Sequence, residues 1–430
     1  MFVRGQLLFE PTEALSIRLI ADYTYRDEKC CAATYVDSSV NPFIGNLNNP
    51  STPLAPLQTN GNNIINVLRD LGQNIGAFNQ GYSRNVSVTP GRSFAGVTKD
   101  YGFSGQIDYD LGGATLTSIT AYREYRSGQA SDTDYGTVDI LYRAESDEAY
   151  RQFHTFTQEL RLQGEAFDGT LDWLVGGFFA NEKLTVRDNL RFGNQYGRFA
   201  TCRIISGGGL AGLYAPGAAG CVNGGIGNLA GIGRNTLIGA TGASGADIVA
   251  GFTALDGLND RGSTIDQYKQ DGTNWALFTH NIVNITDRLA LTLGLRYTND
   301  KKDFSALFGN DNTACTTVQG LLLDDLTTTT AGTATQSATA RALAGALIGL
   351  SCQGNSTAEL NGVSIRDDRK EDEWTGTAIL SYKATDDLLL YASFARGYKA
   401  GGFNLDRSAL KSPIRPFGGQ AGAQALVTNL

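Results

Sequence analysis

The sequence repeats one unit five times: two strand-like runs of about 10 to 15 residues joined by a turn of a few residues, then a long polar segment. The paired runs cover residues 4–25, 101–126, 152–186, 273–304 and 373–398. Their turns are rich in Asp, Gly and Thr, as tight hairpin turns require. The segments between them, residues 27–100, 127–151, 187–272 and 305–372, are rich in Gly, Asn, Ser and Thr. This arrangement predicts an antiparallel meander of about ten strands whose connections alternate between short and long.

The lengths of these connections decide between fold classes. Most connections in compact soluble domains run to about 4 to 6 residues, so a soluble β-sandwich does not alternate minimal turns with such long loops. An outer-membrane β-barrel does, because its turns are short on the periplasmic side and long outside. We therefore predict an all-β fold, an antiparallel up-and-down transmembrane β-barrel, with residues 1–430 forming part of one barrel domain. No apolar run reaches the length of about 20 residues that a membrane helix needs.

Apolar and polar residues alternate along the strands, as lipid-facing and lumen-facing side chains must. In residues 289–298, four leucines and a tyrosine alternate with Ala, Thr, Gly, Arg and Thr, and residues 15–24 and 155–162 show the same period. A soluble secreted β-protein shows this alternation too, but there the apolar face is covered by protein. Aromatic residues near the expected strand ends fit the girdles at the two membrane interfaces: Tyr23, Tyr25, Tyr122, Tyr125, Trp173, Trp275, Tyr297 and Tyr398.

Composition excludes other classes of protein. The 53 glycines follow no three-residue period, which rules out collagen, and 10% aromatic residues are too many for a disordered polymer. The formal net charge is -8 and no Lys/Arg run of five is present, so nucleic acid is excluded as a partner.

The six cysteines fall in three pairs, each within one loop-like segment. Spacing favours disulfides for Cys202 with Cys221 and for Cys315 with Cys352, with free thiols as the alternative; the adjacent Cys30 and Cys31 could bond to each other only with strain. Zinc is disfavoured because there is no C-x2-C pair and neither histidine lies near a cysteine in sequence.

Several runs resemble the barrel strands of TonB-dependent receptors. They are LLLYASFARGYKAGGFN at residues 388–404 and LTLGLRYTNDKKDF at 291–304, then FTQELRLQG with LDWLVGGFFANE, and RGQLLFEPTEALSIRLIADYTYRDE at 4–28. The resemblance covers all five hairpins, the second least firmly, whereas the long loops match nothing known to us. The family barrel motif falls on Arg396, Gly397, Tyr398, Lys399, Gly401, Gly402, Phe403 and Asn404.

The resemblance implies a 22-stranded barrel with an N-terminal plug domain and, ahead of the plug, a short TonB-contacting segment, the TonB box. Neither is in this sequence, so we expect a central fragment of the barrel. The implied function is energy-coupled uptake of a scarce nutrient, in first place a ferric siderophore, in the outer membrane of a Gram-negative bacterium. The implied partners are outer-membrane lipid and the TonB-ExbB-ExbD complex. The alternative is a complete ten-stranded outer-membrane barrel acting as an adhesin or passive channel.

Ligand contacts in such receptors come from lumen-facing strand residues and from loops. Lumen-facing charged residues are the candidates: Arg18, Asp22, Glu159, Arg161 and Arg296, with the loop aromatics Tyr35, Tyr196 and Tyr214. We expect no cofactor, no metal and no catalytic residue, because neither His154 nor His280 lies near a nucleophile in sequence.

Three loop segments complete the expectations. The acidic residues Asp367, Asp368, Glu371, Asp372 and Glu373 are read as a solvated loop base, with Ca²⁺ binding as the alternative. The Gly-rich residues 207–251 are read as a flexible external loop. Residues 64–71 have the apolar spacing of one or two amphipathic helical turns packed on neighbouring loop.

Overall fold

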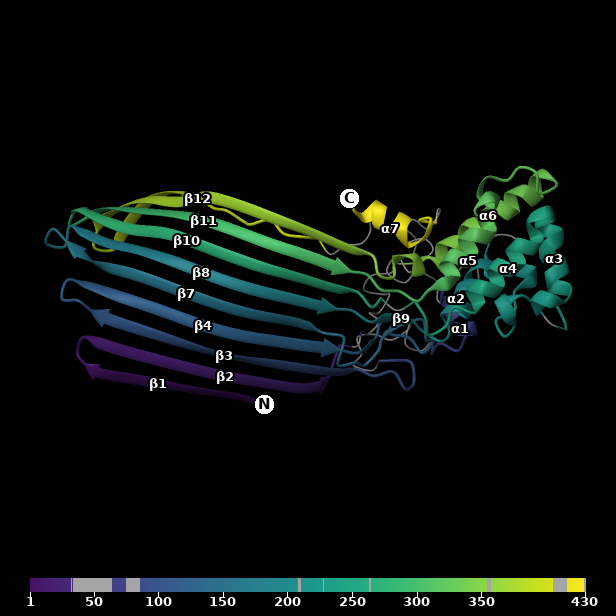
Figure 1. Ribbon diagram of the computed structural model, residues 1–430, viewed down its shortest axis with the longest axis horizontal. Coiled ribbons are helices and arrows are strands. Elements are labelled where there is room, and N and C mark those ends of the chain that lie inside the picture. Colours follow the sequence, from purple (N-terminus) through teal and green to yellow (C-terminus); the bar gives the residue numbers. More distant parts are fainter. Residues whose placement is uncertain are drawn as a thin grey trace.

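A ten-stranded antiparallel sheet dominates the computed structural model, which describes residues 1–31, 33, 64–74, 86–207, 210–226, 228–262, 264–353, 357–404 and 416–428. Its strand order follows the chain, so each strand pairs with the next, and the five predicted hairpins are confirmed. Figure 1 shows the short turns at one end of the sheet and the long connections at the other. The strands are β1 (Phe2–Thr12), β2 (Leu15–Lys29), β3 (Ala95–Asp110), β4 (Ala114–Gln129), β7 (Arg151–Ala166), β8 (Leu171–Arg187), β10 (Gln267–Thr286), β11 (Leu289–Leu307), β12 (Ser364–Thr385) and β13 (Leu388–Arg396).

Several strands are longer than the sequence pattern predicted. β12 begins at Ser364, so the acidic residues from Asp367 to Glu373 lie within a strand, and their assignment to a loop base was wrong. The strand continues there because every residue of this stretch is in register with β11, for example Glu371 with Asp300. A strand that projects into water still pairs its backbone with its neighbours, but neither of its faces needs to be apolar. The alternation of apolar and polar residues therefore ends before the strand does.

One face of the sheet is apolar and bare. Leu160, Leu277 and Leu295 are 50%, 60% and 48% exposed, and none of them belongs to either hydrophobic core of the described residues. We call this the apolar face and the opposite one the polar face. The predicted alternation is confirmed, and no described part of the chain covers the apolar face as a soluble β-protein would require. Exposed apolar surface of this extent marks contact with lipid or another partner.

An aromatic row crosses the apolar face. Ring centroids lie 5.9 Å apart for Phe103 and Tyr122 and 6.3 Å apart for Phe156 and Phe179; Tyr297 lies 5.5 Å from Trp275 and 5.1 Å from Trp374. The row runs through the middle of the strands, not along their ends as predicted, because the strands continue beyond it with charged residues. Tyr125 was wrongly placed in a girdle: its cross-strand partner Asp100 puts it on the polar face, where it contacts Phe153.

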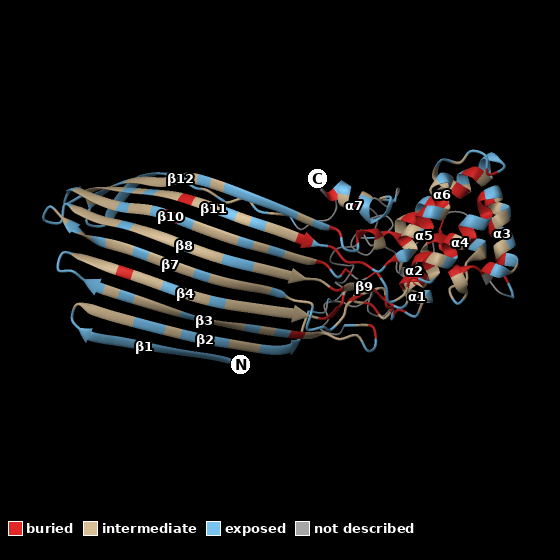
Figure 2. Cartoon of the chain, viewed as in Figure 1, coloured by how far each residue is buried: buried red, intermediate tan, exposed pale blue. Residues whose placement is uncertain are grey.

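The long connections fold into a helical cap, coloured largely as buried where its helices meet in Figure 2. The cap consists of α1 (Ile64–Asp70), α2 (Tyr196–Ser206), α3 (Ile232–Thr241), α4 (Gly245–Asp256), α5 (Thr313–Leu322) and α6 (Ala334–Ser351). α4 packs against α2, α3, α5 and α6, and Ile248, Phe252 and Leu255 on it are fully buried. This spacing gives α4 one apolar side. None of the described helices is both long and apolar enough to cross a membrane.

The described part of the Gly-rich segment is largely helical and is therefore not a flexible loop. The prediction was wrong because some of its glycines serve close packing of helices: a Cβ on Gly251 would lie 2.9 Å from the Leu322 side chain, across α4 and α5. The prediction for residues 64–71 is confirmed by α1, where Val67 is 1% exposed and belongs to the cap core.

Smaller elements join the cap to the strands. β5 (Ser131–Asp132), β6 (Leu141–Arg143) and β9 (Leu190–Phe192) form a three-stranded sheet, and α7 (Gly419–Thr428) packs near the start of β12 on a second small core.

Candidate ligand-binding face and cap junction

Cross-strand register gathers three of the predicted ligand residues on the polar face. Arg161 of β7 is opposite Gly176 of β8, which is opposite Phe278 of β10, which is opposite Arg296 of β11. The absence of a side chain at Gly176 leaves room for the ring, since a Cβ there would lie 2.5 Å from Phe278. We call the set Glu159, Arg161, Phe178, Phe278 and Arg296 the arginine patch.

Stacking on aromatic rings holds Arg296. Its guanidinium carbon lies 5.5 Å from the centroid of Phe278 and 5.7 Å from that of Phe178. Such cation–π contacts contribute about 0.5 to 2 kcal/mol each, depending on solvent exposure. The rings therefore orient the guanidinium without neutralising its charge.

The patch retains positive charge and unused donors. Arg296 Nε donates to Thr298 Oγ1 at 3.1 Å, and among the described residues Arg296 forms no ion pair. Arg161 Nη1 is 3.4 Å from Glu159 Oε1, and its Nε is buried with no hydrogen-bond partner. Planar guanidinium donors are suited to carboxylate-like and other anionic oxygen groups. The arrangement can therefore hold an anion beside aromatic rings.

Arg18 and Asp22 lie apart from the patch, on β2. Arg18 Nη2 donates to Gln106 Oε1 at 2.7 Å. Asp22 forms an ion pair of 2.8 Å with Arg123, whose other terminal nitrogen is 2.5 Å from Asp100. Asp22 is thus already paired with a basic residue of the same sheet. Arg123 was missed from the sequence, although its place on the polar side of the 115–125 alternation could have indicated it.

The residues of the family barrel motif leave the sheet and turn over the polar face. Glu371 of β12 accepts hydrogen bonds from the Tyr398 hydroxyl at 2.6 Å and from the Gly401 N–H at 2.9 Å. Phe403 stacks on Phe304 of β11 with centroids 4.7 Å apart, and before the turn Arg396 pairs with Glu373 at 2.7 Å. Residues 397–404 therefore line the polar side of β11 and β12.

The two loop aromatics among the described residues, Tyr196 and Tyr214, already have partners within the protein. Tyr196 is 4% exposed and its hydroxyl donates to the Leu350 carbonyl at 2.6 Å, so its prediction as a ligand contact was wrong: it is a core residue of the cap. The Tyr214 hydroxyl donates to Asp70 at 3.2 Å. Tyr35 lies outside the described residues.

The six cysteines form three bonded pairs. Cys202 with Cys221 ties α2 to η3 (Ala219–Cys221), Cys315 with Cys352 ties α5 to the end of α6, and Cys30 is joined to Cys31. The first two are the predicted pairs, and both lie in the cap core. Peptide mapping without reduction tests the pairing.

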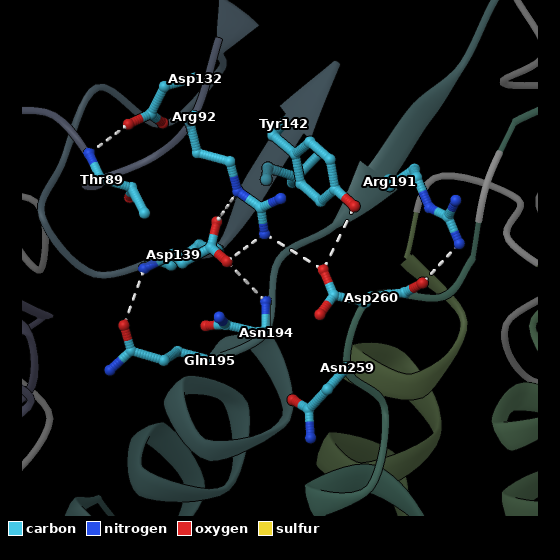
Figure 3. A network of polar contacts seen from close by, with 12 residues as sticks. Thr89, Arg92, Asp132, Asp139, Tyr142, Arg191, Asn194, Gln195, Asn259 and Asp260 are labelled. Atoms are coloured by element: carbon cyan, nitrogen blue, oxygen red, sulfur yellow. Dashed lines mark hydrogen bonds and ion pairs between the residues drawn. The ribbon is translucent and has the colours of Figure 1, made fainter. Parts of the chain in front are cut away.

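A polar network joins the cap to the strand ends (Figure 3). Arg92 stacks on the ring of Tyr142 at 3.4 Å from its centroid, forms an ion pair with Asp139 and lies 3.1 Å from Asp260. Asp139 is 2% exposed and also accepts from the Asn194 N–H at 2.8 Å. We call Arg92, Asp139, Tyr142 and Asp260 the cap junction. No local sequence pattern indicates it, because its members come from three separated connections.

One carboxyl beside the junction titrates unusually. Burial raises the pKa of Asp134 to about 7, and the nearby charge of Asp132 raises it further, while hydrogen bonds from the Leu141 and Ile140 N–H groups oppose the shift. Within the described ranges, no group of three or more His, Cys, Asp or Glu residues is placed to hold a metal ion.

The two histidines lie in strands. His154 Nδ1 lies 3.1 Å from the Tyr122 hydroxyl and 3.4 Å from Glu124, on the apolar face beyond the aromatic row. His280 lies on β10, opposite Gly294.

Comparison with known proteins agrees with this architecture. The model of a family described as TonB dependent receptor-like, beta-barrel matches residues 34–426. A search of curated proteins finds no match. The fold is similar to that of the ferric yersiniabactin uptake receptor FyuA from Yersinia pestis, with a TM-score of 0.50 at 11% identity over 94% of this chain and 38% of that chain.

Two further solved structures are similar at lower scores. The siderophore receptor PiuA from Acinetobacter baumannii gives a TM-score of 0.43 at 14% identity, over 92% of this chain and 41% of that chain. The ferric-catecholate import receptor Fiu from K12 E. coli gives 0.46 at 11% identity, over 95% and 46%. The chain spans less than half the length of each of these receptors.

Proposed function

The chain belongs to the TonB dependent receptor-like β-barrel family, and from this premise we propose that it supplies barrel wall and external cap to an outer-membrane receptor for energy-coupled nutrient uptake. The family is one of receptors and transporters, not of enzymes. The ligand we propose is a ferric siderophore of anionic character.

The observation that carries the choice of ligand is the arginine patch. It faces the barrel lumen if the apolar face contacts lipid, and it combines two guanidinium groups with the rings of Phe178 and Phe278. Ferric ions are chelated by deprotonated oxygen ligands, so many such complexes carry negative charge. An anionic chelate can accept hydrogen bonds from Arg161 and Arg296 while its flat groups contact the rings.

The open sheet supports a larger barrel. β1 and β13 lie at opposite edges, each with one strand partner in the described part of the chain. Unpaired edges are costly in lipid, so a membrane sheet must close. We propose that further strands close this barrel, that a plug domain fills it, and that the TonB-ExbB-ExbD complex supplies energy. A closed ten-stranded adhesin or channel would instead pair β1 with β13.

Uptake measurements in cells test the proposal. In the intact receptor, Arg161→Gln with Arg296→Gln should lower binding of an anionic ferric siderophore at least tenfold and leave a neutral ferric chelate unaffected, because only the charge-assisted hydrogen bonds are lost. Arg288→Gln, in the exposed turn between β10 and β11, is the matched control. Normal binding and uptake by the patch variant, at equal amounts in the outer membrane, would contradict the proposal.

A further inference from the structure

A row of four side chains crosses the apolar face beyond the aromatic row. Register aligns Thr185 of β8, Lys269 of β10, Ser305 of β11 and Arg366 of β12 on successive strands. They line a cavity of 540 Å³. We call them the basic row.

The charge of the basic row is not neutralised. Lys269 and Arg366 are exposed, and neither forms an ion pair in the part of the chain that the structure describes. The acidic residues nearest them in the cavity have other partners: Asp271 lies 3.6 Å from Lys183, and Asp303 lies 2.9 Å from Lys301.

The two cations flank a hydroxyl. Ser305 lies between Lys269 and Arg366 in the row, one strand from each, which is about 5 Å from backbone to backbone. Two basic groups with one hydroxyl donor between them match the chemistry of a phosphate group, which accepts several charge-assisted hydrogen bonds. The row is therefore built for a phosphate or a similar oxyanion.

The position of the row limits where that phosphate can come from. Lys269 is six residues beyond Trp275, and Arg366 is eight residues beyond Trp374. At about 3.3 Å per residue and a strand tilt near 40°, the row lies about 15 to 20 Å outside the aromatic row. The headgroup layer of a bilayer is only about 5 to 8 Å thick on each side. A simple phospholipid holds its phosphate too low to reach the row.

We propose that the basic row binds phosphate groups on the extended sugar head of a membrane glycolipid whose acyl chains lie against the apolar face. The same surface carries both contacts, because Lys269 and Leu277 share one side of β10, with Trp275 between them. The proposal rests on the membrane location in the proposed function, but not on ligand uptake.

Native mass spectrometry of the detergent-purified intact receptor tests the proposal. The probe is a lipopolysaccharide truncated after its phosphorylated inner core, compared with the same molecule after phosphatase treatment and with phosphatidylglycerol. Lys269→Gln with Arg366→Gln should weaken binding of the phosphorylated probe at least tenfold, whereas Lys269→Arg with Arg366→Lys should retain it. The control is Lys302→Gln on β11, three residues nearer the aromatic row than Ser305 and on the polar face, where Lys302 pairs with Asp300.

Each outcome decides the proposal. Phosphate-dependent binding that is lost only in the Gln double variant supports it. The proposal is overturned if the phosphatase-treated probe binds as tightly as the untreated one, or if the Gln double variant binds the untreated probe as tightly as the unmodified protein does. It is also overturned if the double variant loses affinity for phosphatidylglycerol to the same extent. Siderophore uptake measured in parallel keeps the two proposals separate, since a failed glycolipid site leaves the arginine patch untouched.

Discussion

The wall and the cap place their apolar residues in opposite ways. In the wall, Leu277 is 60% exposed on a face that no described residue covers; in the cap, Phe252 is fully buried among helices. In both regions the backbone N–H and C=O groups are hydrogen-bonded, by pairing between strands in the wall and within helices in the cap. We infer from this difference that one chain is adapted to two solvents, with lipid against the strands and water excluded from the core of the cap.

Glycine has different uses in the two regions. Gly176 in the wall leaves space for the ring of Phe278, which supports the arginine patch. Gly197 in the cap allows α2 to approach the end of α4, because a Cβ there would lie 2.4 Å from the Asp256 carbonyl oxygen.

The largest expected effect tests whether the cap depends on a closed protein core and the wall does not. Phe252→Ala should destabilise the cap by about 3 to 5 kcal/mol, since it leaves a cavity in a closed core. Leu277→Ala should cost little, because lipid or detergent fills the space. Hydrogen exchange in micelles measures both: the first variant should lose protection in α2 to α6 while the strands keep theirs. Equal loss of protection in wall and cap for both variants would break the comparison.

A smaller effect tests whether the cap glycines serve packing. Gly197→Ala should destabilise the cap by about 1 to 3 kcal/mol through overpacking against Asp256. Gly239→Ala on α3 meets nothing within 4 Å and should stabilise its helix by up to about 1 kcal/mol. Protease resistance of the cap reports both changes. Similar behaviour of the two variants would mean that the glycines provide flexibility, as the sequence suggested.

The last expected effect concerns pH. The pKa of Asp134 is raised by burial from 3.8 to about 7, so between those values the folded cap holds a proton that the unfolded chain has released. Cap stability should therefore fall as pH rises from about 4 to about 7, and stay level above that. Asp134→Asn should flatten this part of the profile. Thermal melting of the cap at several pH values compares the two proteins, and identical slopes would refute the assignment.

The wall could be predicted from sequence because its signals are local. Period-two alternation around Leu293 and turn residues such as Asp287 define hairpins within a few residues. The cap could not, because Phe252 meets Leu322 only after helices from separate connections have packed, and glycines between them suggested a loop.

The candidate site was predicted in pieces. Alternation along single strands was enough to predict that Glu159, Arg161 and Arg296 face the lumen. These residues lie close together only because of the register between β8 and β10, two strands that are separated in sequence by a long connection. The register places Gly176 opposite Phe278. No local pattern specifies that register.

The most direct test of the account is the accessibility of spin labels placed at positions 277 and 278 of the intact receptor in lipid bilayers. We predict frequent collisions with oxygen and few with a water-soluble nickel chelate at 277, on the apolar face, and less contact with lipid-dissolved oxygen at 278, on the polar face. Collision with the nickel chelate at 277 as frequent as at an exposed cap position would show that the apolar face does not contact lipid, and would contradict the account.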